Sequence, residues 1–154
     1  MVGFDFSRRE DLDHIEPPSG FDLGDMEIAG NVRVVSSRGR TPDQGMMIFI
    51  ALVELLDGLR RKLKPGHPYE FVGADSSFIL DFREENGSVV IESGGQRIDS
   101  SPKLDLLRAV SRAAHVFVDR ELPKLPPDDA AKEDISPSVV EFDSYITDVA
   151  RRSR

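Results

Sequence analysis

The dipeptide Asn86-Gly87 lies between two runs of residues with high β propensity, and it constrains the fold more than any other feature of the chain. Asn-Gly favours a two-residue type I′ hairpin turn, because both central residues of that turn require φ > 0. If the residues that flank the turn pair with each other, Phe82 lies opposite Ile91 and Arg83 lies opposite Val90. The turn therefore predicts both a hairpin and its register.

Two further turns, Gly94-Gly95 and Ala74-Asp75, extend this hairpin into a four-stranded antiparallel meander over residues 69–99. The additional cross-strand pairs that they predict are Glu92–Arg97, Ile91–Ile98, Phe71–Phe78 and Tyr69–Leu80. All three turns place the same apolar residues on one face, and a slip by one residue would move them to the other. The predicted buried face consists of Tyr69, Phe71, Phe78, Leu80, Phe82, Val89, Ile91 and Ile98.

The opposite face of the meander carries charged side chains. Asp81, Glu92 and Arg97 form a cross-strand row, and Arg83 on the diagonal helps Arg97 to relieve the carboxylate pair. A solvated sheet face explains this pattern and is the favoured interpretation. The alternative is a polar site, including an enzyme that uses the open-face carboxylates Asp81 and Glu92.

Helices are expected before and after the meander in the sequence. A strand over residues 27–36, with Ile28, Val32 and Val34 on one face, precedes the capping-box pattern of residues 41–44, with Thr41 as N-cap. The helix that follows should reach about Lys64. Its predicted buried stripe is Ile48, Leu52, Leu55, Leu56, Leu59 and Leu63.

The second predicted helix has Ser101 as N-cap and Pro102 at its first position, and it ends near Leu122. Residues 122–135 are interpreted as a linker rich in Pro and acids. A third amphipathic helix from Ser136-Pro137 to about Arg152 is expected, although residues 139–142 could instead form a strand. The fold class is therefore α+β, with a β-α-β-β-β-β-α core, a mostly antiparallel sheet, and helices packed on one face.

The chain is divided into an acidic N-terminal arm (1–26), a core (27–122) and a linker with a C-terminal amphipathic helix (123–154) in the same domain. In the arm, Phe4 and Phe6 alternate around Asp5 like a short strand, and residues 7–15 could form a helical turn. Phe21 and Leu23 are expected to attach the arm to the core.

Composition restricts the class of protein. The chain of 154 residues has no Cys, which excludes disulfides, thiolate metal sites and a Cys nucleophile. The acidic first residues do not resemble a signal peptide, and the longest apolar run, 46–53, is too short to span a bilayer. We expect a cytoplasmic protein without membrane contact, and the preference for Arg over Lys suits a GC-rich bacterial genome.

Net charge is −8 and is unevenly distributed. Residues 1–26 contain seven acids and only two bases, which favours a basic protein partner, although the charge could simply keep the protein soluble. The apolar side of the C-terminal segment must be buried either on its own domain or on a second subunit, so a homodimer is a second prediction.

No pattern for a metal, a cofactor or a catalytic group is present. The three His residues are far apart, and there is no Gly-x-Ser-x-Gly or phosphate-binding Gly loop. One loop has the residues to bind an anion: Ser36, Ser37, Arg38 and Arg40 precede the predicted N-terminus of the first helix, where free N–H groups favour negative charge. An ordinary solvated loop is the alternative.

The order helix–strands–helix over residues 42–122 resembles double-stranded-RNA-binding domains in topology alone. Such domains need basic residues in the first turn of the second helix, where this chain has Lys103 followed by Asp105, and RNA binding requires phosphate neutralisation. The acidic chain therefore predicts no nucleic-acid partner.

The function class that remains is a protein-binding module. Small acidic toxin-immunity or inhibitor proteins of bacteria are one example of this class, named by analogy and not from a shared motif. A small-ligand or anion-binding domain that uses the Ser36–Arg40 loop is the first alternative. An enzyme ranks last.

Overall fold

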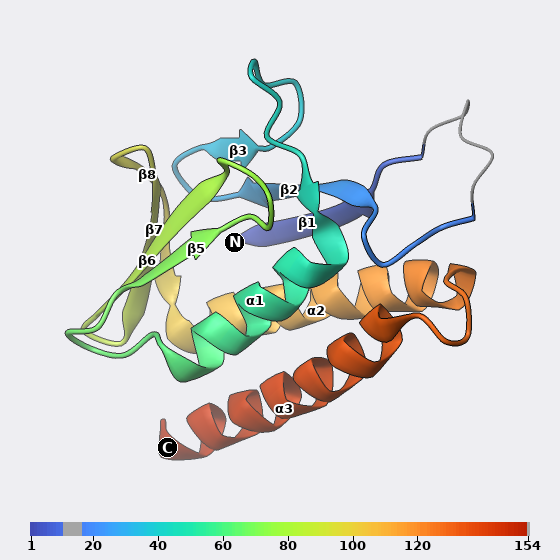
Figure 1. Cartoon of the computed structure of the whole chain (residues 1–154). Coiled ribbons are helices and arrows are strands. Elements are labelled where there is room, and N and C mark those ends of the chain that lie inside the picture. The colour runs from blue at the N-terminus through green and yellow to red at the C-terminus, as the bar shows by residue number, and fades with distance from the viewer. Residues whose placement is uncertain (11–16, 154) are drawn as a thin grey trace.

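The computed structural model describes residues 1–10 and 17–153 of the chain. They form an α+β fold in which two antiparallel four-stranded sheets lie on one side of the α helices (Figure 1). The elements are β1 (Gly3–Arg8), β2 (Leu23–Ala29), β3 (Val34–Ser36), β4 (Met46–Met47), α1 (Ile48–Arg61), β5 (Tyr69–Val72), β6 (Ile79–Glu85), β7 (Ser88–Ser93), β8 (Gln96–Pro102), α2 (Lys103–Glu121), the 3-10 helix η1 (Leu122–Lys124) and α3 (Ala130–Arg152).

The predicted meander is confirmed as the sheet β5-β6-β7-β8. Phe82 lies opposite Ile91, and Glu92 lies opposite Arg97. Asn86 and Gly87 have φ values of 51° and 81°, as the type I′ turn between β6 and β7 requires. All eight apolar residues of the predicted inner face are buried, so the argument from alternation identified the correct face.

Two details of the predicted register are wrong. Residues 73–78 form a longer connection than a two-residue turn, so Phe71 lies opposite Leu80 rather than opposite Phe78. This shift of two residues leaves every side chain on its predicted face, because the side-chain period of a strand is two. A bulge at Ile91/Glu92 adds a residue to β8, so Ile91 lies opposite Asp99 rather than Ile98.

The single strand expected over residues 27–36 is instead a hairpin. β2 and β3 pair antiparallel in a separate sheet, with Ile28 opposite Val35. Val32 and Val34 are 54% and 62% exposed, so they do not share a buried face with Ile28. The turn between the strands packs against β8, where the Val32 amide donates to the Ile98 carbonyl at 3.0 Å.

The described N-terminal residues belong to the same hydrophobic core as the rest of the chain. β1 pairs with β2, and both Val2 and Phe6 are buried, so the strand predicted around Asp5 is confirmed. The prediction that Phe21 attaches the arm is wrong, because its side chain is 72% exposed; Leu23 is exposed as well. Of the helical turn predicted over residues 7–15, Ser7 and Arg8 belong to β1, residues 9 and 10 have no regular structure, and residues 11–15 lie outside the described part.

The buried stripe of α1 is confirmed, but the capping box is wrong. Residues 41–45 form a loop with a cis peptide bond between Thr41 and Pro42, and α1 begins at Ile48. The amide of Met47 donates to the Ala74 carbonyl, and the amide of Ile48 donates to the Asp22 carbonyl. Backbone carbonyls therefore satisfy the start of this helix in place of a Thr side chain.

The second and third helices begin away from their predicted positions. Ser101 and Pro102 belong to β8, and the Ser101 hydroxyl donates to the buried Asp99 carboxylate rather than capping α2. α3 begins at Ala130, where the Asp129 side chain accepts from the Ala131 amide at 2.9 Å, so much of the predicted linker is helical. The strand alternative for residues 139–142 is wrong.

The helices form two layers. α1 and α2 cover the sheets, and α3 lies along their outer side, away from the strands (Figure 1). Val139 and Phe142 of α3 are buried in this contact. The apolar side of α3 thus packs within its own chain, which removes the original argument for a homodimer through this segment.

Candidate functional site: a groove between β1 and α2

The loop of Ser36, Ser37, Arg38 and Arg40 does not lie at a helix N-terminus, because α1 begins at Ile48. Its polar groups are used within the chain. The Ser36 side chain accepts from the Arg38 amide, and Arg40 Nε donates to the Ser36 carbonyl at 3.0 Å. Anion binding by this loop stays a prediction, now without the free helix amides on which it depended.

The fully buried Ser37 belongs to an ionic network instead. Its hydroxyl donates to Asp25 at 2.7 Å, and Arg9 donates to both oxygens of the same carboxylate and also to Asp43. Burial alone would raise the pKa of Asp25, but the hydrogen bonds from Arg9 and Ser37 outweigh it and hold the pKa below its usual value. Arg38 Nε lies 3.8 Å from Asp25, so the network links this loop to β1 and β2.

The predicted polar cluster lies together on the outer face of the meander. Asp81 is opposite Glu92, Glu92 is opposite Arg97, and Arg83 Nη1 donates to Glu92 Oε1 at 2.8 Å. The hydrogen bonds that Arg83 donates to Glu85 and Glu92 raise the pKa of its guanidinium. The arrangement is that of a solvated, charge-paired sheet face, and a role in ligand binding or catalysis stays a prediction.

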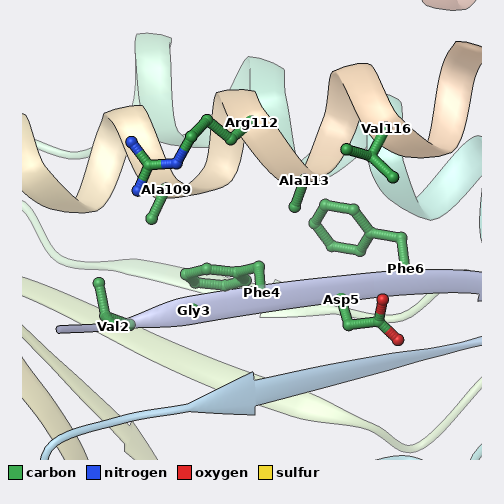
Figure 2. A pocket seen from close by; sticks show the side chains of 9 residues that line it. All are labelled: Val2, Gly3, Phe4, Asp5, Phe6, Ala109, Arg112, Ala113 and Val116. Atoms are coloured by element: carbon green, nitrogen blue, oxygen red, sulfur yellow. The ribbon is translucent and has the colours of Figure 1, made fainter.

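A different feature of the structure has the geometry of a binding site. The strand order β1-β2-β3 leaves β1 at a sheet edge, and a groove of about 320 Å³ lies between β1 and α2. Figure 2 shows Phe4 and Phe6 directed from β1 toward α2, with Ala109 and Ala113 directed from α2 toward the strand. We call this the β1–α2 groove; its remaining walls include Arg112 and Val116.

The outer edge of β1 borders this groove, and no strand within residues 1–10 and 17–153 pairs with that edge. The Arg9 amide donates to the Leu23 carbonyl, which makes Arg9 and Leu23 a hydrogen-bonded pair in the β1–β2 register. Hydrogen-bonded pairs alternate along an antiparallel ladder, so the N–H and C=O groups of Phe4 and Phe6 point away from β2. Arg120 Nη2 donates to the Phe6 carbonyl at 2.9 Å, which agrees with that direction.

Charge at the groove is positive on the helix side. Arg112 lies near the start of β1, where its Nη2 is 3.9 Å from Met1 Sδ (Figure 2). Among the described residues, no carboxylate lies within ion-pair distance of Arg112. The small hydrophobic floor of the groove, the exposed Arg112 and the edge of β1 can together accommodate an extended peptide. The one carboxylate among the lining residues, Asp5, lies 3.8 Å from Arg38.

The nearest arrangement to a catalytic group lies on the opposite side of α2. His115 Nε2 is 2.7 Å from Asp143 Oδ2, and the Ser111 hydroxyl donates to Oδ1 of the same carboxylate at 2.7 Å. A nucleophilic triad needs the His between Ser and Asp, whereas here Asp143 lies between the other two. The contacts therefore join α2 to α3. They also leave His115 hydrogen-bonded but half-exposed.

No group of three or more His, Asp or Glu side chains is arranged to hold a metal ion within residues 1–10 and 17–153. In the same ranges, no helix combines the length and apolar character needed to cross a membrane.

The β1–α2 groove was not among the predicted sites, although parts of its pattern are visible in the chain. Phe4-Asp5-Phe6 predicts a strand, and Ala109 and Ala113 are small residues four positions apart on one helix. What the pattern lacks is the strand order that leaves β1 at an edge beside α2. Comparisons with protein-family models, curated proteins and solved structures found no significant match to this chain.

Proposed function

We propose that this protein is a protein-binding module that receives an extended segment of its partner as an added strand along β1. The observation that carries the proposal is the outward-facing backbone of Phe4 and Phe6 beside the β1–α2 groove. Strand addition obtains affinity from main-chain hydrogen bonds and specificity from pockets for alternate side chains. The Phe4 N–H and C=O and the Phe6 N–H supply the hydrogen bonds.

The groove also restricts the partner's sequence. Side chains directed toward α2 would meet Ala109, Ala113 and the exposed Val116, so small or β-branched apolar residues fit at alternate positions. A segment antiparallel to β1 would place its C-terminal end near Gly3, beside Arg112. An acidic residue or a terminal carboxylate there would pair with the Arg112 guanidinium.

This chemistry differs from the basic partner predicted from the acidic N-terminal residues. Asp5, Glu10, Asp22 and Asp25 each lie within 4 Å of an Arg or Lys of the same chain. Charges that are paired within the same chain contribute little to long-range attraction of a partner. A basic partner and an immunity-like role stay predictions, while the groove supports a segment that ends in negative charge.

The test uses the fluorescent heptapeptide Thr-Val-Thr-Val-Thr-Val-Glu with a free C-terminus, titrated with the full chain in an anisotropy assay. We expect saturable binding that is lost when alternate residues, those whose N–H groups face β1, are N-methylated. Arg112→Glu should weaken binding at least tenfold, since it replaces an attractive charge pair with a repulsive one. Arg108→Glu, one turn away on α2 and outside the groove, is the matched control.

Val116→Asp should also weaken binding, with Val140→Asp on the exposed side of α3 as its control. Equal affinity for the N-methylated peptide, or equal loss in Arg108→Glu and Arg112→Glu, would overturn the proposal. If the chain forms a concentration-dependent dimer and Arg112→Glu dissociates it, the occupant of the groove is a second copy of the chain and not a partner peptide.

A further inference from the structure

A second and larger cavity, of about 810 Å³, lies at the other end of the helical layers. The C-terminal ends of α1 and α3 meet there with the N-terminal end of α2 and the β6–β7 turn. The volume falls within the range of small-molecule sites in proteins. Neither the proposed strand addition nor any predicted site residue involves this cavity.

The cavity has a local excess of positive charge in an acidic protein. Four cationic side chains line it, against two carboxylates, whereas the whole chain carries a net charge of −8. The positive end of the α2 macrodipole also lies here, opposed by the negative ends of the α1 and α3 macrodipoles, so the excess of positive charge comes from the side chains. The four cations are Arg60, Lys64, Lys103 and Arg152.

Lys103 is held in place on the wall of the cavity. Its Nζ pairs with Glu84 Oε2 at 2.8 Å, and the two side chains are only 16% and 10% exposed. The same Nζ lies 5.8 Å from the ring centroid of Tyr145. These contacts preorganise the ammonium group, which lowers the entropic cost of binding an anion.

Arg60 borders the cavity and is held by two carboxylates, while its Nε is buried without a hydrogen bond to any described residue. Its Nη2 donates to Glu141 Oε2 at 2.7 Å and lies 3.6 Å from Asp57. Its Nε is buried and has no hydrogen-bond partner within the described ranges. Nε itself has almost no exposed surface, so the cavity meets Arg60 through other atoms of its side chain.

The rest of the lining is largely apolar. Leu63 is buried, Leu104 and Val149 are half-buried, and the half-buried Tyr145 adds an aromatic ring. Charged donors beside a hydrophobic wall favour a ligand that combines an anionic group with an apolar body. We propose that this cavity binds a small organic carboxylate, with its anionic group at the cations and its hydrocarbon part against Leu63 and Val149.

The probe is octanoate, titrated by calorimetry and by ¹H–¹⁵N spectra of the full chain. We expect saturable binding, with shifted amides at Arg60, Lys103 and Val149 and none at Phe4 or Phe6. Octanol lacks the charge, octylammonium reverses it, and acetate lacks the apolar body, so each should bind at least tenfold more weakly. Equal binding of octanol or acetate would overturn the proposed ligand class.

Two double variants with the same change in net charge locate the site. Lys64→Gln with Arg152→Gln removes two exposed cations of the cavity, and we expect a roughly tenfold rise in the octanoate Kd. Lys62→Gln with Arg151→Gln removes two cations outside the lining and should change the Kd less than about twofold, as for screened surface charge. Equal losses in the two double variants, or no saturable binding of octanoate, would overturn the proposal.

Discussion

Arg9 and Asp25 form a two-point ion pair that joins the end of β1 to β2. Arg9 Nε donates to Asp25 Oδ2 at 2.9 Å, and Arg9 Nη2 donates to Oδ1 at 3.0 Å. Asp25 is buried and also accepts from Ser37 at 2.7 Å, while Arg9 continues to the exposed Asp43. One carboxylate thus anchors both β1 and the loop after β3.

Asp25→Ala should lower the free energy of unfolding by about 1–3 kcal/mol, because it leaves the buried Ser37 hydroxyl and the Arg9 guanidinium without their acceptor. Chemical denaturation measures the change. Asp43→Ala is the matched control: it removes an exposed carboxylate from the same Arg9, and its effect should be clearly smaller. Equal losses in the two variants would contradict the anchoring role of Asp25.

Stability should also depend on pH through Asp25. Burial raises the pKa of this carboxyl group, but the hydrogen bonds from Arg9 and Ser37 lower it by more than burial raises it. The pKa of Asp25 therefore lies below the usual 3.8. A group with a depressed folded-state pKa contributes its full stability above its unfolded-state pKa and loses it as pH falls through the folded value. We expect unfolding midpoints to decrease as pH falls from about 5 toward 2. Asp25→Asn should make the unfolding midpoint depend less on pH in this range. An unchanged pH dependence in this variant would contradict the role of Asp25.

Gly58→Ala should destabilise the protein even though it raises helix propensity. A Cβ at Gly58 would overlap the Tyr69 ring, which packs against α1 and donates its hydroxyl to the Glu54 carbonyl at 2.9 Å. Overpacking of this kind costs about 1–3 kcal/mol, more than the roughly 1 kcal/mol gained from propensity. In a Tyr69→Leu background the same substitution should be neutral or stabilising. Thermal unfolding of the four proteins in this cycle measures the coupling.

The N-cap of α3 gives a prediction with an internal control. Asp129→Ala removes the acceptor for the Ala131 amide and for the Gly20 amide, so it should cost about 1 kcal/mol or more. Thr41→Ala should change the denaturation midpoint little, because Thr41 lies in an exposed loop rather than at a helix start. The reverse ranking would restore the capping box and contradict the observed helix starts.

These cases show which parts of the fold were predictable from the chain. The meander was, because its turns and its alternation indicate the same buried face independently, and Phe82, Ile91 and Ile98 all lie on that face even though the bulge changes the partner of Ile91. Helix stripes were also predictable, since burial at a period of 3.6 depends only on local geometry. The apolar stripe of α1 identified the helix even though its start was misplaced by several residues.

Features that depend on partners distant in sequence were not predictable. Thr41-Pro42 matches a helix start locally, but Asp43 is bound by Arg9 and α1 begins later. The local pattern places Val32 and Val34 in one strand with Ile28. The turn between β2 and β3 packs against β8, and this contact with a distant segment leaves no pattern in the local sequence. The β1–α2 groove has the same origin: a strand edge is defined by the order of strands, which no single segment encodes.

The central claim is that the Phe4 and Phe6 backbone groups accept an added strand, and residue-resolved amide hydrogen exchange tests it most directly. In the free protein, the amides of Phe4 and Phe6 should exchange faster than those of Asp5 and Ser7, whose partners lie in β2. Saturation with Thr-Val-Thr-Val-Thr-Val-Glu should slow exchange at Phe4 and Phe6 and leave Asp5 and Ser7 unchanged. Unaltered exchange at Phe4 and Phe6 in the presence of bound peptide would contradict the account.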